Sequence, residues 1–324
     1  MCTAATYLTK DHYFGRNLDL DHSNHEAVTI TPRNFPFRFR RAGSLETHYA
    51  MIGMACVADG YPLYYDATNE TGLSMAGLNF PDNADYKPET PGKDNVSPFE
   101  FIPWLLGQCV DLSQARTLLA RLNLVRIPFR ADMPLAPLHW MISDRSGSIV
   151  VECVREGLKI YDDPAGVLTN NPPFDFQMLN LRNYMGLTAD APVNRFCPAL
   201  ELKPYCLGMG AIGLPGDLSS ASRFVRAAFT RLNSVSGGSE SESVSQFFHI
   251  LGSVAQQRGC VRLGDGRYEI TVYSSCCNTD RGIYYYTTYE NSQITGVDMH
   301  RENLDGRMLS VYPLITGQQI RMQN

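Results

Sequence analysis

The sequence of 324 residues predicts an α+β protein, a four-layer αββα sandwich of two mainly antiparallel β-sheets between helices. The first observation is the order of the expected elements: strands, two helices, strands, two helices, strands. The second is that sequential strands are joined by short turns, without the strand–helix alternation of parallel βαβ units. The third is an ordinary globular composition, with 44% apolar and 19% charged residues. We therefore expect a single domain over residues 1–324.

The first eighty residues predict short strands, each β-rich and bounded by Gly, Pro, Asn or Asp. These strands are Cys2–Thr9, His12–Asp19, Ala27–Arg33, Ala50–Cys56, Tyr61–Asn69 and Leu73–Phe80. A helix follows, because Ser97-Pro98-Phe99-Glu100 is a capping box with Pro at the first helical position. Asp111 begins a second helix, with apolar residues at helical spacing at Ala115, Leu118, Leu119 and Leu122. Strands return at Ser148–Val154, Leu158–Asp162 and Val167–Thr169.

The second half begins with a segment rich in Pro and Gly, Thr188–Pro215, which we expect to be a loop. It would serve as an arm for a partner subunit or as a lid. Ser219 or Ser220 caps the next helix, and Ser243 with Gln246 forms a capping box for another, after a linker at Ser236–Glu242. The last strands are expected at Tyr268–Ser275, Ile283–Tyr289, Gln293–Met299 and Met308–Leu314.

Charge and cysteine usage exclude several classes of protein. The net charge of −5 gives no basic face for nucleic acid. The chain has no run of about 18 apolar residues and no secretory signal, so no membrane span is expected. The nine cysteines form no C-x-x-C pair, which fits reduced, mostly buried thiols. We expect a soluble, cytoplasmic protein.

No cofactor or metal is expected. Gly208–Gly213 matches G-x-G-x-x-G as a string, but no apolar strand precedes it and Pro204 and Pro215 flank it, which favours a flexible loop. The seven histidines show no metal-ligand spacing. A G-x-S-x-G elbow is absent, which argues against a serine hydrolase of that type.

Cys2 directly follows Met1, and a Met before a small residue is normally removed, which would make Cys2 the N-terminal residue. It would then carry both a thiol and a free α-amine, with ordinary pKa values of about 8.5 and about 8. The thiolate is the reactive form, and an N-terminal amine can act as the base for a nucleophile on its own residue. Cys2 is therefore a candidate nucleophile; lipidation, or no role, are the alternatives.

Arg16 and Asp19 lie on a strand that could return as the hairpin partner of the strand beginning at Cys2. In that arrangement Arg16 would favour the thiolate and Asp19 could hold the α-amine. The alternative is a surface Arg–Asp pair of little energetic value. Spacing alone does not decide between them.

Three further polar residues lie at the ends of expected elements. Asn79 and Asn170 close apolar strands before a turn, either as ordinary turn residues or as amide donors for a developing oxyanion. Arg223 lies in the first turn of its helix, where a cation is unfavourable for the helix dipole. This position indicates a partner carboxylate or a functional anion.

The segments that carry these residues together resemble the choloylglycine hydrolase family. They are Met1-Cys2-Thr3, Phe14–Asp19, Gly77–Phe80, Val167–Pro172 and Gly213–Val225. The resemblance spans essentially the whole chain, including Ser97–Gly107, Leu138-His139-Trp140 and Tyr284-Tyr285-Tyr286. It implies an N-terminal nucleophile hydrolase with an αββα sandwich, which agrees with the order of the elements, and it implies removal of Met1.

The resemblance also implies the site residues. The nucleophile, the charged pair, the two oxyanion contributors and the remaining arginine fall on Cys2, Arg16, Asp19, Asn79, Asn170 and Arg223. Candidate apolar walls of the substrate cavity, chosen by loop position, are Leu18, Leu20, Ala58, Phe129, Met133 and Leu135. Some family members carry a bulky aromatic residue at the place of Ala58, so a wider cavity is expected here.

The implied activity is hydrolysis of the amide bond of glycine- and taurine-conjugated bile salts through a Cys2 thioester. The implied assembly is a homotetramer, and our interpretation of residues 188–215 is that they form its intersubunit arm. One alternative is an amidase like the related penicillin V acylases, although these often carry Tyr at the place of Asn79. Another is an inactive homologue that binds amphipathic anions, to which a retained Met1 would point.

Overall fold

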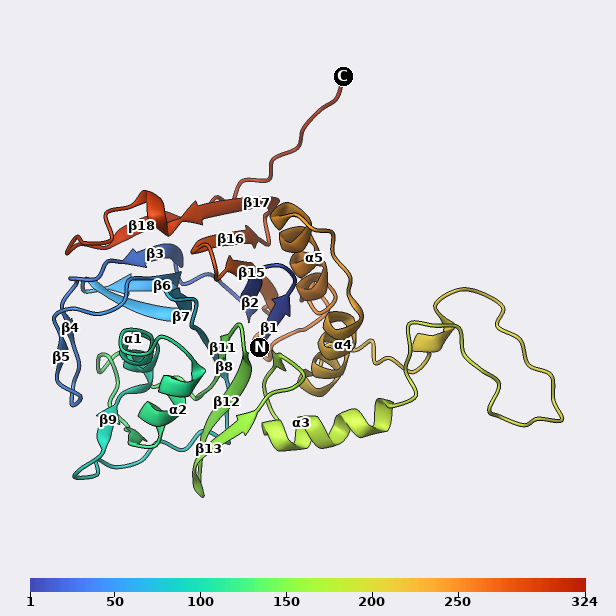
Figure 1. Ribbon diagram of the computed structural model, residues 1–324, viewed down its shortest axis with the longest axis horizontal. Coiled ribbons are helices and arrows are strands. Elements are labelled where there is room, and N and C mark those ends of the chain that lie inside the picture. Colours follow the sequence, from blue (N-terminus) through green and yellow to red (C-terminus); the bar gives the residue numbers. More distant parts are fainter.

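Two large antiparallel sheets form the centre of the computed structural model, which describes residues 1–324 (Figure 1). The six-stranded sheet has the order β14 (Val167–Leu168), β1 (Cys2–Leu8), β2 (His12–Leu20), β15 (Ile270–Asn278), β16 (Ile283–Thr288) and β17 (Asn291–Asp298). The first hairpin, β1–β2, places Cys2 opposite Leu18. The N-terminus thus lies inside a sheet.

The eight-stranded sheet has the order β13 (Gly157–Asp162), β12 (Gly147–Val154), β11 (Leu138–Asp144), β8 (Ser74–Asn79), β7 (Tyr61–Asn69), β6 (Met51–Ala58), β3 (Ala27–Thr31) and β18 (Ser310–Pro313). Two short pairs lie outside the large sheets. They are β4 (Phe37–Arg38) with β5 (Ser44–Leu45), and β9 (Asp94–Val96) with β10 (Leu122–Leu124).

Helices cover the outer face of each sheet (Figure 1). On the eight-stranded sheet lie α1 (Phe101–Leu106), after the 3₁₀ turn Pro98–Glu100, and α2 (Leu112–Leu119). On the six-stranded sheet lie α4 (Ser220–Asn233) and α5 (Glu240–Gly252), with α3 (Phe174–Asn180) against α4. This is the αββα sandwich that the order of elements predicts. Further 3₁₀ turns occur at Leu181–Tyr184, Met209–Ala211 and Met299–Arg301.

The core has two parts. One cluster joins the facing sheets and continues to α4 and α5, and it includes Phe14, Leu78 and Phe247. The other lies between α1, α2 and the eight-stranded sheet around Trp140. Strands β1 and β2 are therefore covered on both faces, so their polar side chains must find partners inside the protein.

Some boundaries differ from the sequence expectations. Strand β11 is additional, and its polar residues His139 and Ser143 are buried and hydrogen-bonded, so the segment does not appear as an apolar run. Helix α2 ends at Leu119, and Leu122 lies in β10 instead of on the helix. Asp111 caps α2 as expected, accepting a hydrogen bond from the backbone N–H of Gln114.

The start of α5 is also different. The helix begins at Glu240 and uses the capping box of Ser239 and Glu242, whereas Ser243 and Gln246 lie within it. The expected linker is thus partly helical, because the earlier capping box satisfies the first free N–H groups.

Residues 188–215 extend away from the two sheets, with one 3₁₀ turn at Met209–Ala211 as their only regular element (Figure 1). Many of their apolar side chains are exposed, among them Phe196 and Leu207. We call this segment the arm. None of the helices is long and apolar enough to span a bilayer.

Candidate active site

Cys2 begins β1 and is 3% exposed. Its cross-strand partner is Leu18, and two residues further along Ala4 is opposite Arg16. Because side chains alternate along a strand and directly opposed residues share a face, Cys2 and Arg16 lie on the same face of the hairpin. That face is directed at the eight-stranded sheet.

Arg16 is fully buried between the sheets. Its Nη1 donates to the carbonyl oxygens of Tyr65 at 3.0 Å and Gly77 at 2.5 Å, while Nη2 has no hydrogen-bond partner. Burial opposes its charge, but the facing Cys2 sulfur and the Asp66 carboxylate raise the pKa of Arg16 above its ordinary value. The guanidinium is therefore a buried cation with its Nη2 unpaired, on the same face of the hairpin as the thiol.

Asp19 lies on the opposite face of β2 from Arg16 and is also fully buried. Its Oδ1 accepts a hydrogen bond from the hydroxyl of Thr271 at 2.6 Å, and its Oδ2 lies 3.9 Å from Nη1 of Arg223. Burial raises the pKa of Asp19 to about 6, an effect that Arg223 and the N-terminal ammonium partly oppose. Both residues are 0% exposed and form no ion pair with each other, so the alternative of a surface Arg16–Asp19 pair is wrong.

Met1 precedes β1 and is hydrogen-bonded to Asp19 of β2. The N–H of Asp19 donates to Met1 O at 2.9 Å, and the Met1 ammonium donates to Asp19 O at 2.7 Å and contacts the Glu269 carboxylate. Removal of Met1 would leave the Asp19 carbonyl oxygen and the Glu269 carboxylate beside the Cys2 α-amine. Glu269 and Thr271 are not among the residues that the sequence predicts for the site, because no spacing rule links them to Cys2.

Asn170 connects the N-terminus to α4. Its Oδ1 accepts hydrogen bonds from the Cys2 N–H at 2.8 Å and from Nη2 of Arg223 at 2.8 Å. Its Nδ2 donates to Asn79 O at 2.6 Å, and its own N–H donates to Ser220 Oγ at 2.8 Å. Two donors facing Oδ1 fix the orientation of the amide, and one Nδ2 hydrogen remains for another acceptor.

Arg223 is buried in the first turn of α4. Its Nη1 donates to Cys2 O and to the Thr3 hydroxyl, both at 2.6 Å. Burial lowers the pKa of Arg223, and the Asp19 carboxylate opposes that effect. The unfavourable place of this cation on its helix is thus explained by Asp19 and by the carbonyl and amide oxygens that it binds.

Asn79 ends β8, and its side chain is exposed. Its backbone carbonyl accepts from Asn170, as described above. In an antiparallel strand the N–H and C=O of one residue point to the same edge. The N–H of Asn79 is therefore directed to the Asn170 side, while the next N–H, that of Phe80, donates to Pro137 O on the other edge.

A cavity of about 590 Å³ adjoins the buried Arg16. Its lining includes Tyr65 and Gly77, whose carbonyl oxygens bind Arg16, and three of the expected apolar residues, Phe129, Met133 and Leu135. We call it the acyl cavity. Its other lining residues are largely apolar or aromatic, such as Leu63, Phe99, Ile102, Leu138 and Trp140.

The remaining three expected wall residues are not among the lining of the acyl cavity. Leu18 is buried opposite Cys2, and Leu20 is half-buried against the core. Ala58 is half-buried at the end of β6, opposite Tyr61. Leu18 and Leu20 lie on β2, next to the strand that carries Cys2, and Ala58 lies beside the cavity. None of the three is on the cavity wall.

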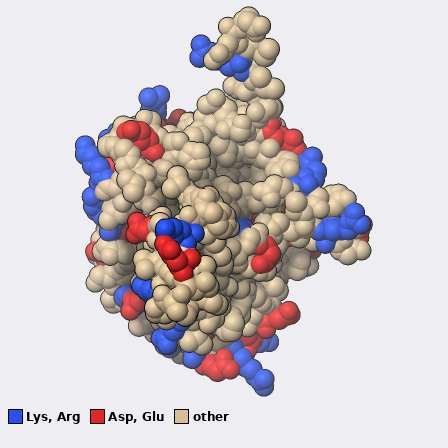
Figure 2. All heavy atoms as spheres, turned by 90° about the vertical axis from the view of Figure 1, so that its right-hand side faces the viewer, with Lys and Arg blue, Asp and Glu red and all other residues tan.

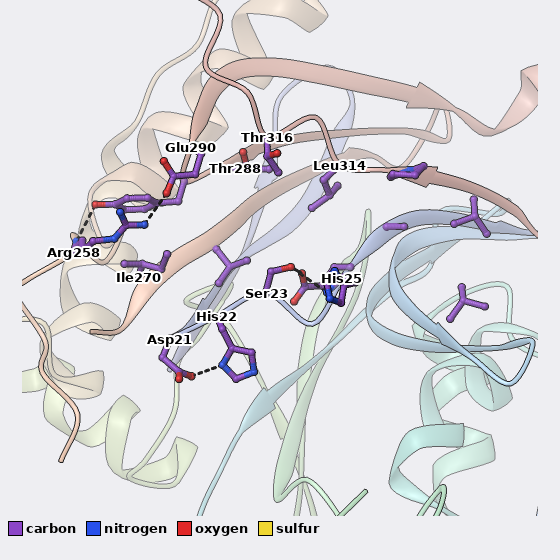
Figure 3. A pocket seen from close by; sticks show the side chains of 17 residues that line it. Asp21, His22, Ser23, His25, Arg258, Ile270, Thr288, Glu290, Leu314 and Thr316 are labelled. Carbon is purple, nitrogen blue, oxygen red and sulfur yellow. Dashed lines mark hydrogen bonds and ion pairs between the residues drawn. The ribbon is translucent and has the colours of Figure 1, made fainter. Parts of the chain in front are cut away.

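A second cavity, of about 660 Å³, lies on the other side of the loop 21–26 (Figure 3). His22, Ser23 and His25 line both cavities, so this loop is the wall between them. In the second cavity Arg258 pairs with Glu290 at 2.6 Å and Asp21 contacts His22 at 2.9 Å. Glu26 accepts hydrogen bonds from the Ser23 hydroxyl and the Asn24 N–H.

The structure holds no cluster of three or more His, Cys, Asp or Glu residues suited to a metal ion. All nine cysteines are free thiols. Gly208–Gly213 lies in the arm and is preceded by no strand there. Its first glycine precedes a single 3₁₀ turn in place of the helix that a dinucleotide site requires.

Comparison with known proteins gives one consistent result. A family model described as linear amide C–N hydrolases, choloylglycine hydrolase family, matches residues 2–312. The chain is 56% identical to the bile salt hydrolase/transferase of Lactiplantibacillus plantarum over 314 residues, covering 97% of each chain. It is 41% identical to the bile salt hydrolase/transferase of Clostridium perfringens over 317 residues, covering 96% of each.

Solved structures agree with this result. The C2A mutant of the conjugated bile acid hydrolase from Clostridium perfringens superposes with a TM-score of 0.91 at 39% identity, covering 100% of both chains. The penicillin V acylase from Agrobacterium tumefaciens has a TM-score of 0.72 at 19% identity, covering 99% of this chain and all of its own. The second likeness shows a shared fold.

Proposed function

The chain belongs to the choloylglycine hydrolase family of linear amide C–N hydrolases, and from this premise we propose that it hydrolyses glycine- and taurine-conjugated bile salts. The observation that carries the proposal is the convergence on Cys2. Asn170 Oδ1 accepts its N–H, and Arg223 donates to its carbonyl oxygen. Arg16 lies on the same face of the hairpin as the sulfur, with its Nη2 unpaired.

The first step follows from this geometry once Met1 is removed. The Cys2 α-amine takes the thiol proton, Arg16 stabilises the thiolate, and Asp19 stabilises the resulting ammonium. The sulfur then attacks the amide carbonyl carbon, whose C=O electron pair moves to oxygen. The Asn79 backbone N–H and the second Nδ2 hydrogen of Asn170 point to this oxyanion, and such a donor is worth about 3 kcal/mol.

Collapse of the tetrahedral intermediate breaks the C–N bond. The α-ammonium gives its proton to the departing nitrogen of glycine or taurine, which leaves the acyl group as a Cys2 thioester. Water, deprotonated by the same amine, attacks the thioester carbonyl. The C–S bond breaks, the free bile acid leaves, and the α-ammonium returns its proton to the Cys2 thiolate. The acyl cavity, largely apolar and about 590 Å³ in volume, is the proposed site of the steroid during both steps.

The decisive experiment compares the wild type with Cys2→Ala in taurocholate hydrolysis, together with the intact mass of each protein. We expect loss of Met1, turnover by the wild type and none by the folded variant. Turnover by Cys2→Ala would contradict the mechanism. A retained Met1 without turnover would favour the inactive, anion-binding homologue, and faster cleavage of penicillin V than of taurocholate would favour the acylase.

A labelling experiment tests the activation of Cys2 independently of substrate. Cys206 and Cys260 are exposed and would compete for iodoacetamide, so both are changed to Ser in the protein used. We expect Cys2 to react before the remaining thiols, most of which are buried. Burial raises the pKa of Cys109 and Cys277, in each case to about 12.

We also propose the assembly, the location and the extent of the domain. The arm offers exposed Phe196 and Leu207 to another copy, in a homotetramer of single-domain chains over residues 1–324. Nine free thiols support a reducing, cytoplasmic location.

A further inference from the structure

A buried His–Glu couple lies behind Asn170. His139 on β11 and Glu152 on the neighbouring β12 are both 0% exposed, and His139 Nδ1 lies 3.0 Å from Glu152 Oε1. The ring of Phe80 stacks on the imidazole, with centroids 4.2 Å apart and an interplanar angle of 5°. Neither residue contacts the proposed reacting atoms.

The hydrogen bonds of the couple determine where its protons lie. His139 Nε2 is 2.9 Å from the carbonyl oxygen of Thr169, which can only accept, so Nε2 carries a proton. An unprotonated Nδ1 facing an ionised Glu152 would set two lone pairs against each other. One proton must therefore lie between Nδ1 and Oε1, and the couple is neutral overall, which reduces the cost of burying it.

The couple holds both ends of one loop. His139 binds the carbonyl of Thr169, the residue before Asn170. Glu152 Oε1 also accepts the backbone N–H of Phe174, at 3.0 Å. The loop between these two anchors carries Asn170, whose side chain lies 2.8 Å from the Cys2 nitrogen.

We propose that His139 and Glu152 are positioning residues that fix Asn170 against the Cys2 amine and the oxyanion. The inference rests on the proposed function for the role of Asn170. Ser220 on α4 binds the N–H of Asn170 from the helix side, so the couple supplies the restraint from the sheet side. An error of about 1 Å in such a group costs about 10²-fold in rate.

The experiment uses three variants with taurocholate as substrate. His139→Leu removes both hydrogen bonds at similar volume, and we expect kcat to fall about 10²-fold with KM changed less than about twofold. His139→Gln keeps a donor for the Thr169 carbonyl, and we expect most of kcat to return. Thermal denaturation of each variant sets an assay temperature at which all are folded.

His12→Leu is the matched control. His12 is 3% exposed and binds the hydroxyls of Thr279 at 2.9 Å and Ser143 at 3.3 Å, so the same change removes two buried hydrogen bonds. It lies six residues along β2 from the partner of Cys2, about 20 Å away. We expect a loss of stability with kcat within about twofold of the wild type.

The outcomes separate the inference from the proposed function. Equal kcat in folded His139→Leu and His12→Leu, or an effect on KM alone, would overturn the inference. If His139→Leu does not fold, Glu152→Gln decides: one amide atom cannot both accept from Phe174 and donate to His139, so kcat should fall about tenfold. An unchanged kcat in folded Glu152→Gln would overturn the inference.

A wild type without bile salt turnover would contradict the proposed function and leave the couple testable by Cys2 alkylation. In that case the iodoacetamide rate should still fall about tenfold in His139→Leu relative to His12→Leu, because a misplaced amine is a poorer base for the thiol. Equal alkylation rates would overturn the inference.

Discussion

Asp19 connects the proposed chemistry to pH. Burial raises its pKa from 3.8 to about 6, so the folded protein binds this proton more tightly than the unfolded chain. The stability that comes from the protonated form is fully present below pH 3.8 and is lost as pH rises through about 6. The ionised form, which is proposed to stabilise the Cys2 ammonium, dominates only above that pH.

We therefore expect kcat/KM for taurocholate to fall about tenfold per pH unit below about pH 6. Taurocholate is suitable because its sulfonate does not titrate in this range. Thr271→Val removes the hydroxyl that donates to Asp19 Oδ1, so the carboxylate is less stabilised and the acid limb should move to higher pH. If the acid limb of the kcat/KM profile is not shifted in Thr271→Val, a group other than Asp19 sets that limb.

The two asparagines should respond differently to truncation. Asn170→Ala removes the acceptor of the Cys2 N–H and a proposed oxyanion donor, and we expect kcat to fall by 10²–10³-fold, about 3–4 kcal/mol. Asn79→Ala leaves the backbone N–H in place and changes an exposed side chain, so kcat should stay within about tenfold. Steady-state kinetics of both variants provide the measurement, and equal losses would show that the Asn79 side chain itself takes part.

The sequence allowed the residues around Cys2 to be selected but not their contacts. The N-terminal cysteine, and polar residues at the ends of strands, are visible locally. The resemblance then assigned the roles that spacing left undecided. The partners Asn170 and Arg223 are separated by 53 positions and meet only because α4 packs against β14. His139 lies in a segment of the resemblance but received no role, and Glu152 gave no signal, because an isolated buried polar residue in a strand has no periodicity to reveal it.

At the level of elements, the contact between β2 and β15 depends on Gly15. A Cβ on Gly15 would lie 2.0 Å from the carbonyl oxygen of Ser275, a backbone atom that cannot move without separating the strands. These two strands carry Asp19 and Thr271, so their spacing also sets the site.

We expect Gly15→Ala to lower the free energy of unfolding by at least about 3 kcal/mol, since the clash is with backbone. Urea denaturation measures the change. Gly186→Ala is the control, because a Cβ there would meet nothing within 4 Å. Equal midpoints for the two variants would contradict the close contact of β2 and β15.

Elements with a strong local signal could be predicted, and those set by tertiary contacts could not. Strand Tyr61–Asn69 has the predicted bounds, and β1 and β2 differ from prediction by one residue, because turn residues limit them. Helix α3 gave no such signal: Pro173 precedes it without a side-chain cap, and its stability comes from contacts with the rest of the molecule, including α4. The predicted start of α5 was wrong because the sequence offers two capping boxes: Ser239 and Ser243 each precede a suitable Glu or Gln by three residues.

At the scale of the whole molecule, the arm is the part that the two-sheet core does not explain. Figure 2 shows the side of the molecule to which the arm extends, where positive and negative residues are interspersed among large uncharged areas. No single-sign field on this side opposes contact with an identical copy. Phe196, Leu207 and Tyr205 are each more than four-fifths exposed, at 83%, 98% and 84%.

Three exposed apolar side chains of this size on a projecting segment support the proposed assembly, in which another copy would cover them. We expect the change of Phe196 and Leu207 to Ser to shift the protein from the proposed tetramer to smaller species, measured by light scattering after size-exclusion chromatography. Val235, 85% exposed in the connection between α4 and α5, provides the control Val235→Ser, which should leave the mass unchanged. Because Cys2 and its partners lie within one chain, turnover per chain should persist if the dissociated subunits stay folded. A wild type that is already monomeric, or a double variant that remains tetrameric, would contradict the proposed role of the arm in assembly.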